Sequence, residues 1–267
     1  METRKTEFKL ARIFYLVWRG SIRVLTLPFR GLGEGRFKNS IRQFILNFQH
    51  SLPTEFVVNK GDTVVQIGTP WPKTMRRFLR ALGSDGMLVI VEAMPENQER
   101  LETVITTDAI DNVLLIKGAA ANENRNGELL ISPYKGDHKI EVTNIAMDND
   151  LKPGNDYETR IPVQFFKLDD ELQRHGISKF DYLSVTVNGA EAEVLKGASE
   201  ILKNCNPGTR VYAKGHAIDE SSNPIHILTK QIMDENGYNT KITRGEPSST
   251  LDSRWLWRAG DLYAWKT

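Results

Sequence analysis

The chain has 267 residues, of which 40% are hydrophobic and 26% charged, and this composition excludes a disordered, collagen-like or low-complexity protein. The 35 basic and 34 acidic side chains leave a formal net charge of +1, which excludes a protein that binds polyanions through its overall charge. The single cysteine, Cys205, excludes an internal disulfide and a cysteine-cluster metal site, and it is compatible with a reducing, cytoplasmic location.

Positive charge is concentrated in the first 42 residues, which hold ten basic and three acidic side chains. On a helical wheel, the basic residues Lys5, Arg12, Arg19, Arg23 and Arg30 fall on one side, opposite a wide apolar arc. The pattern predicts a basic amphipathic N-terminal helix, and residues 1–50 are expected to form an extension separate from a domain over 51–267.

Two interpretations of this predicted helix stay open. Its apolar side packs on the domain or on a second subunit of an oligomer, or the helix contacts a protein partner or an anionic membrane surface, on the inner face of the membrane. The longest uninterrupted apolar run, Ile13–Trp18, is too short to span a bilayer. The candidate contact residues are Arg12, Trp18, Arg19, Arg23 and Arg30.

Beyond residue 60, short apolar runs typical of buried strands alternate with segments of helical spacing. The predicted parallel strands are Thr63–Ile67, Met87–Glu92, Val113–Lys117, Phe180–Val187 and Arg210–Ala213. The predicted helices are 73–82, 97–106, 169–175 with Asp169 as N-cap, 190–203 and 225–235. The predicted closing strands are Tyr238–Thr243 and Asp261–Trp265. Continuous apolar strands separated by helices indicate a mostly parallel seven-stranded sheet covered on both faces.

Residues 122–160 are less regular, with antiparallel pieces expected at Leu129–Ser132 and Ile140–Ile145 and a further ordered run at Val163–Phe166. Ligands of an open α/β sheet bind beyond the carboxyl ends of its strands, so the turn Gln66–Pro72 is the informative place. Glu92 ends the next strand, where a carboxylate can accept two hydrogen bonds from a ribose diol. The turn has one glycine, Gly68, so these features alone are a weak signal for nucleotide binding.

Four segments together resemble the FkbM-type S-adenosylmethionine-dependent methyltransferases over roughly residues 55–265. They are GDTVVQIGTPWPKTMRRFLRALGSDGMLVIVEAMPEN, NVLLIKGAAANENRNGELLIS, IPVQFFKLDD and FDYLSVTVNGAEAEVLKGASEILK. The resemblance implies a Rossmann-like class I methyltransferase fold and S-adenosylmethionine as cofactor. It implies cofactor contacts at Gln66, Gly68, Thr69, Glu92 and Ala120, and catalytic roles for His216 and Glu191.

The chain departs from the family pattern at polar positions. Gln66 stands where the family has Asp, Pro72 where it has Gly, Thr186 where it has Asp, Asn188 where it has Glu, and Lys214 where it has Glu before His216. Thr186 and Asn188 cannot act as bases at neutral pH. Proline suits the first position of a helix, so we expect the helix after the turn to persist while Pro72 and Trp71 intrude on the cofactor pocket.

Two functions therefore stay open. The first is a catalytically impaired or inactive methyltransferase-like protein that serves as a binding or assembly subunit, in which S-adenosylmethionine does not have to bind. The second is an active O-methyltransferase that acts on a sugar, glycan or lipid-linked hydroxyl. Nucleic acid is disfavoured as a partner, because the sheet lacks interleaved aromatic and basic residues. The dispersed histidines also disfavour a metal site.

Overall fold

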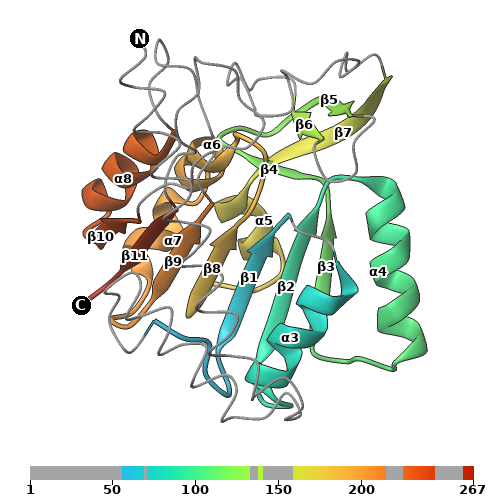
Figure 1. Cartoon of the computed structure of the whole chain (residues 1–267), viewed down its shortest axis with the longest axis horizontal. Helices are drawn as coiled ribbons and strands as arrows, with labels where there is room; N and C mark the ends of the chain where they lie inside the picture. The colour runs from blue at the N-terminus through green and yellow to red at the C-terminus, as the bar shows by residue number, and fades with distance from the viewer. Residues whose placement is uncertain (1–55, 69–70, 133–137, 141–158, 215–224, 244–260) are drawn as a thin grey trace, which may run out of the picture.

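A computed structural model describes residues 56–68, 71–132, 138–140, 159–214, 225–243 and 261–267. Its main sheet has seven strands in the order β10-β11-β9-β8-β1-β2-β3 (Figure 1). The strands are β1 (Thr63–Ile67), β2 (Met87–Glu92), β3 (Val113–Lys117), β8 (Tyr182–Val185), β9 (Arg210–Ala213), β10 (Asn239–Ile242) and β11 (Leu262–Trp265). The first five are parallel, and β11 is antiparallel to both of its neighbours. The predicted mostly parallel, seven-stranded sheet is thus confirmed.

Helices cover both faces of this sheet (Figure 1). On one face, Met75 and Phe78 of α3 (Pro72–Leu82) and Leu101 of α4 (Pro95–Thr107) pack against β1 and β2. The other face is covered by α5 (Leu168–Arg174), α6 (Glu191–Lys196), α7 (Ser199–Asn204) and α8 (Ile225–Glu235). Because strands buried on both faces need apolar residues at every position, β1 and β2 read as continuous apolar runs.

A second, four-stranded sheet in the order β4-β7-β5-β6 follows β3. Its strands are β4 (Ala119–Ala121), β5 (Arg125–Ile131), β6 (Lys139–Ile140) and β7 (Thr159–Lys167). It lies above the carboxyl ends of β1, β2 and β3 in Figure 1. The antiparallel pieces predicted near residues 129 and 140 pair here, Leu129 with Ile140, but the short strand β4 was not predicted. Residues 141–145 of the second piece lie outside the described residues.

The predicted helix over 190–203 is wrong in one respect, because the structure divides it into α6 and α7 at Gly197. A Cβ at Gly197 would lie 1.8 Å from the carbonyl oxygen of Ala121 in β4, so only glycine allows this approach. Asp169 is also not the N-cap of α5, which is Lys167. Its carboxylate instead accepts hydrogen bonds from the backbone N–H groups of Glu200 and Ile201, at 2.9 Å each, and caps α7.

The predicted N-terminal helix lies outside the described residues, so its contacts stay predictions. Within the part of the chain that the structure describes, no helix is both long enough and apolar enough to cross a bilayer.

Candidate functional site

A cavity of about 330 Å³ opens at the carboxyl ends of the central strands, between the main sheet and the small sheet. This is where the chain, having run outward from β1 to β3, returns to place β8 on the other side of β1, and open α/β sheets bind ligands at such a switch point. The volume lies within the range of small-molecule sites. The residues that line it include Gly68, Trp71, Glu92, Met94, Glu96, Asn97, Arg100, Ala119, Ala120, Leu129, His138, Thr186, Val187, Asn188 and Lys214.

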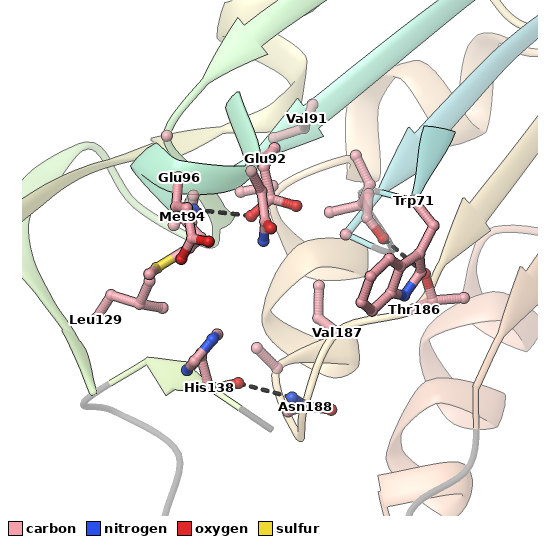
Figure 2. A pocket seen from close by; sticks show the side chains of 18 of the residues that line it. Trp71, Val91, Glu92, Met94, Glu96, Leu129, His138, Thr186, Val187 and Asn188 are labelled. Carbon is pink, nitrogen blue, oxygen red and sulfur yellow. Dashed lines mark hydrogen bonds between the residues drawn. The ribbon is translucent and has the colours of Figure 1, made fainter. Parts of the chain in front are cut away.

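Glu92 brings a buried carboxylate to this cavity from the end of β2, and only 6% of the residue is exposed. Its Oε1 accepts a hydrogen bond from the Met94 N–H at 2.7 Å (Figure 2). Gln98 Nε2 donates to the backbone carbonyl of Glu92 at 2.8 Å. Burial raises the pKa of the Glu92 carboxyl, against the lowering effect of hydrogen bonds from Met94, Asn97 and Ala93. The structure thus holds an acceptor group in a place where water is scarce.

Gly68 directly follows β1 and has a φ of 71°, a conformation that favours glycine. Its N–H donates to the Val91 carbonyl at 3.0 Å, and a Cβ at this position would lie 2.7 Å from the Thr186 carbonyl oxygen. The close approach of the chain after β8 therefore explains the glycine without any ligand. Gly68 also lines the cavity, so its backbone is available to a bound molecule.

Gln66 and Thr186 hydrogen-bond to each other at the ends of β1 and β8. Gln66 Nε2 donates to Thr186 Oγ1 and to the Gly68 carbonyl, at 2.8 Å each, and the Thr186 hydroxyl donates to the Ile67 carbonyl at 3.1 Å. Gln66 is buried and is not among the residues that line the cavity. Gln66 and Thr186, which both differ from the family pattern, thus satisfy their hydrogen-bonding groups with each other and with the neighbouring backbone.

Trp71 and Pro72 form the start of α3, as expected from the sequence. Trp71 is the N-cap of α3, and Pro72 occupies its first turn. The N–H groups of a first turn have no acceptor within the helix, so the N–H that proline lacks costs the helix no hydrogen bond. The indole lies at the side of the cavity near the ends of β1 and β8, with 46% of the residue exposed (Figure 2). Trp71 therefore lines the cavity, which keeps its volume of about 330 Å³ beside the indole.

His138 and Asn188 meet at the opposite side of the cavity from Glu92 in Figure 2. Asn188 Nδ2 donates to the His138 carbonyl at 2.7 Å, which joins the small sheet to the loop after β8. His138 Nδ1 accepts the Ser132 N–H at 3.1 Å, so a neutral imidazole carries its proton on Nε2. Sequence reasoning missed His138 as a cavity residue, because only the folding of the small sheet brings it there.

The predicted site residues are therefore only partly brought together. Gly68, Glu92 and Ala120 line the cavity. Gln66 lies behind it, and Glu191 is fully buried at the start of α6 and does not line it. Thr69, His216 and the N-terminal contact residues lie outside the described residues. Arg100 and Lys214 line the cavity without having been predicted to bind a cofactor.

An open, doubly wound α/β sheet with a ligand-sized cavity and a buried carboxylate at its switch point defines a Rossmann-like fold of the class I methyltransferase type. The profile of the methyltransferase FkbM domain matches residues 55–240, and the chain belongs to that family. The resemblance found in the sequence is thereby confirmed.

Several solved structures are similar to the chain. Aeropyrum pernix fibrillarin with bound S-adenosyl-L-methionine is 16% identical, with a TM-score of 0.45 over 84% of this chain and 73% of that one. The O-methyltransferase from Bacillus cereus in complex with SAH is 14% identical, with a TM-score of 0.46 over 93% and 90%. An S-adenosylmethionine-dependent methyltransferase from Aquifex aeolicus is 11% identical, with a TM-score of 0.41 over 85% and 98%. No curated protein matches the chain.

Proposed function

We propose that the cavity binds S-adenosylmethionine and that the chain transfers its methyl group weakly or not at all, acting as a binding or assembly subunit. The observation that carries the proposal is the contrast between the two sides of the cavity. Glu92 of β2 presents a buried carboxylate, whereas the side chains of Thr186 and Asn188, which follow β8, are hydrogen-bonded to the protein itself.

The residues present fit the cofactor. The buried carboxylate of Glu92 suits a ribose diol, because it can accept two hydroxyl hydrogen bonds while Met94 N–H holds it in place. Met94, Ala119, Ala120 and Leu129 give the cavity an apolar side for a flat base. When bound, S-adenosylmethionine supplies an electrophilic methyl group on a sulfonium.

The surroundings of β8 support weak transfer. A positioned base typically contributes about 10²–10⁴-fold to a proton-coupled step. Thr186 and Asn188 are not bases at neutral pH, and each is already hydrogen-bonded, to Gln66 and to the His138 carbonyl. Among the described residues that line the cavity, the carboxylates are Glu92 and Glu96, and Glu96 pairs with Arg100 at 2.9 Å.

The first prediction concerns the binding of the cofactor. Calorimetric titration with S-adenosylmethionine should give saturable binding to the full chain, and Glu92→Ala should weaken it about 10- to 150-fold, because a hydrogen bond to a charged group is worth about 1.5–3 kcal/mol. Glu96→Ala is the matched control, since Glu96 lines the same cavity but is paired with Arg100. It should change affinity less than about threefold.

The same preparations, incubated with sugars, glycans and lipid-linked alcohols, should release S-adenosylhomocysteine no faster than a sample without acceptor. Absence of heat at millimolar cofactor would contradict binding. Acceptor-dependent product formed at about 1 s⁻¹ or faster, a rate typical of enzymes, would contradict weak transfer and would favour a second candidate, an active O-methyltransferase on one of these hydroxyls. The observation in favour of that candidate is that His138, whose imidazole is a common general acid or base, also lines the cavity.

A further inference from the structure

We propose that the indole of Trp71 binds the sulfonium of S-adenosylmethionine through a cation–π contact and so distinguishes it from the neutral product S-adenosylhomocysteine. The inference rests on the proposed function and adds a residue to it. Trp71 and Ile227 are the exposed large apolar side chains among the described residues, and of the two only Trp71 lines the cavity.

Hydrogen bonds hold the backbone of Trp71 in a defined place beside the cavity. The Trp71 carbonyl accepts the N–H groups of Thr74 and Met75, at 2.8 and 3.2 Å, so the residue is tied to the first turn of α3. Pro72 restricts the next φ angle. Because the backbone is already ordered, only the two side-chain torsions of Trp71 lose freedom when the indole binds a ligand.

The layout of the cavity places a charged tail near this ring. Figure 2 shows Glu92 between Leu129 and Met94 on one side and Trp71 and Thr186 on the other. A nucleoside whose ribose is held at Glu92 has an apolar side for its base, formed by Met94 and Leu129. The substituent on the opposite end of the ribose then extends toward Trp71, and in this cofactor that substituent begins with the sulfonium.

The N-terminus of α3 repels a nearby cation less than most helix N-termini do. Helix N-termini usually favour anions through their unpaired N–H groups. Here Pro72 has no N–H, and the N–H of Thr74 is bonded to the Trp71 carbonyl. The carboxylate of Glu92 favours a cation in the same cavity.

Two cationic side chains, Arg100 and Lys214, line the cavity, and neither directly opposes a sulfonium bound beside Trp71. Arg100 pairs with Glu96 at 2.9 Å. Lys214 follows β9, which is separated from β1 by β8, so its backbone lies on the order of 10 Å from the end of β1. Lys214 is therefore better placed for the carboxylate of the same cofactor than for repelling its sulfonium.

The test compares two ligands that differ in the methyl group and its charge. Cation–π contacts are worth about 0.5–2 kcal/mol, so the wild-type chain should bind S-adenosylmethionine about 3- to 30-fold more tightly than S-adenosylhomocysteine by calorimetry. Trp71→Leu should bring that ratio close to one. Trp71→Phe should give an intermediate ratio, because a phenyl ring attracts cations less than an indole does.

Met94→Ala is the matched control, because Met94 lines the apolar side of the cavity. It should weaken both ligands equally and leave the ratio unchanged. The exposure of Trp71 means that its variants should keep the wild-type melting temperature. A ratio that Trp71→Leu leaves unchanged, while Glu92→Ala still weakens S-adenosylmethionine, would overturn the inference and leave the proposed function standing. Absence of binding to the wild-type chain would overturn both.

Discussion

Glu92 carries its charge where water scarcely reaches, with 6% of the residue exposed. Hydrogen bonds from Met94 and Asn97 offset part of the desolvation, but burial has the larger effect and raises the pKa of the carboxyl. A group of this kind destabilises the folded state once it is ionised, because the unfolded chain solvates the charge better. Residues that lower the stability of the fold in this way are common at binding sites, where they are retained because they bind the ligand.

We therefore expect Glu92→Gln to raise the free energy of unfolding at pH 8 by about 0.5–2 kcal/mol, since the amide oxygen can still accept the Met94 N–H without a buried charge. As the pH falls from above the raised pKa toward the ordinary value of a glutamate, the wild-type carboxyl becomes protonated and the difference should shrink. Urea unfolding of both proteins at pH 5 and pH 8 measures this. An equal difference at the two pH values would contradict the buried charge.

At the scale of elements, the junction of α5, α6, α7 and β4 depends on two residues. Gly197 has no side chain, which lets β4 pass close to the turn between α6 and α7, and its carbonyl accepts the Asp169 N–H at 2.9 Å. The Asp169 carboxylate then caps α7. One acidic side chain on α5 thus fixes the start of another helix and the break before it.

Asp169→Ala should lower the free energy of unfolding by about 1–2 kcal/mol, because two N–H groups at the start of α7 lose their acceptor. Asp169→Asn should lose less, since its amide oxygen still accepts one of them. The neighbouring Asp170→Ala is a control that leaves α7 capped, and the midpoint of urea unfolding is the measurement. Equal losses in the two alanine variants would contradict the capping role.

The limits of sequence reasoning follow from the same contacts. Strands buried on both faces produce continuous apolar runs, so β1, β2 and β3 were predicted with the bounds that the structure has. Asp169 caps a helix 31 residues later, and His138 meets Asn188 across 50 residues. No local pattern signals such contacts. The positions of Glu92 and Gly68 at strand ends are a local feature and only a weak signal by themselves, the family resemblance implies that they contact a cofactor, and both line the cavity.

At the scale of the whole molecule, the charge distribution separates two parts of the chain. The first 42 residues hold ten basic and three acidic side chains, although the whole chain has a formal charge of only +1. The remaining residues hold 25 basic and 31 acidic side chains and are therefore acidic overall. We therefore expect an anionic surface to be attracted to the N-terminal segment more than to the rest of the chain.

We expect phosphatidylcholine vesicles that contain phosphatidylserine to bind the full chain. Replacement of Arg12, Arg19 and Arg23 by glutamine should weaken binding roughly 150-fold, because each basic side chain near such a surface contributes about 1 kcal/mol, or about 3 kcal/mol for the three. The matched control replaces Arg36, Lys38 and Arg42, which belong to the same basic segment of the sequence but fall off the basic side of the predicted helical wheel. Cosedimentation measures both. Equal loss in the two triple variants would contradict a helical contact face, and no binding by the wild-type chain would contradict membrane contact.

The order of the strands also determines how long an edge of β1 stays unpaired while the protein is being synthesised. The Thr63 N–H at the start of β1 donates to the Asp181 carboxylate, 118 residues later, and the neighbouring strand β8 begins directly after it. At about 5–20 residues per second, a ribosome needs roughly 6–24 s to cover that distance. Throughout this interval one edge of β1 has no strand to pair with, and such edges attract other chains. Slow translation between β3 and β8 should therefore increase the dependence of the nascent protein on chaperones.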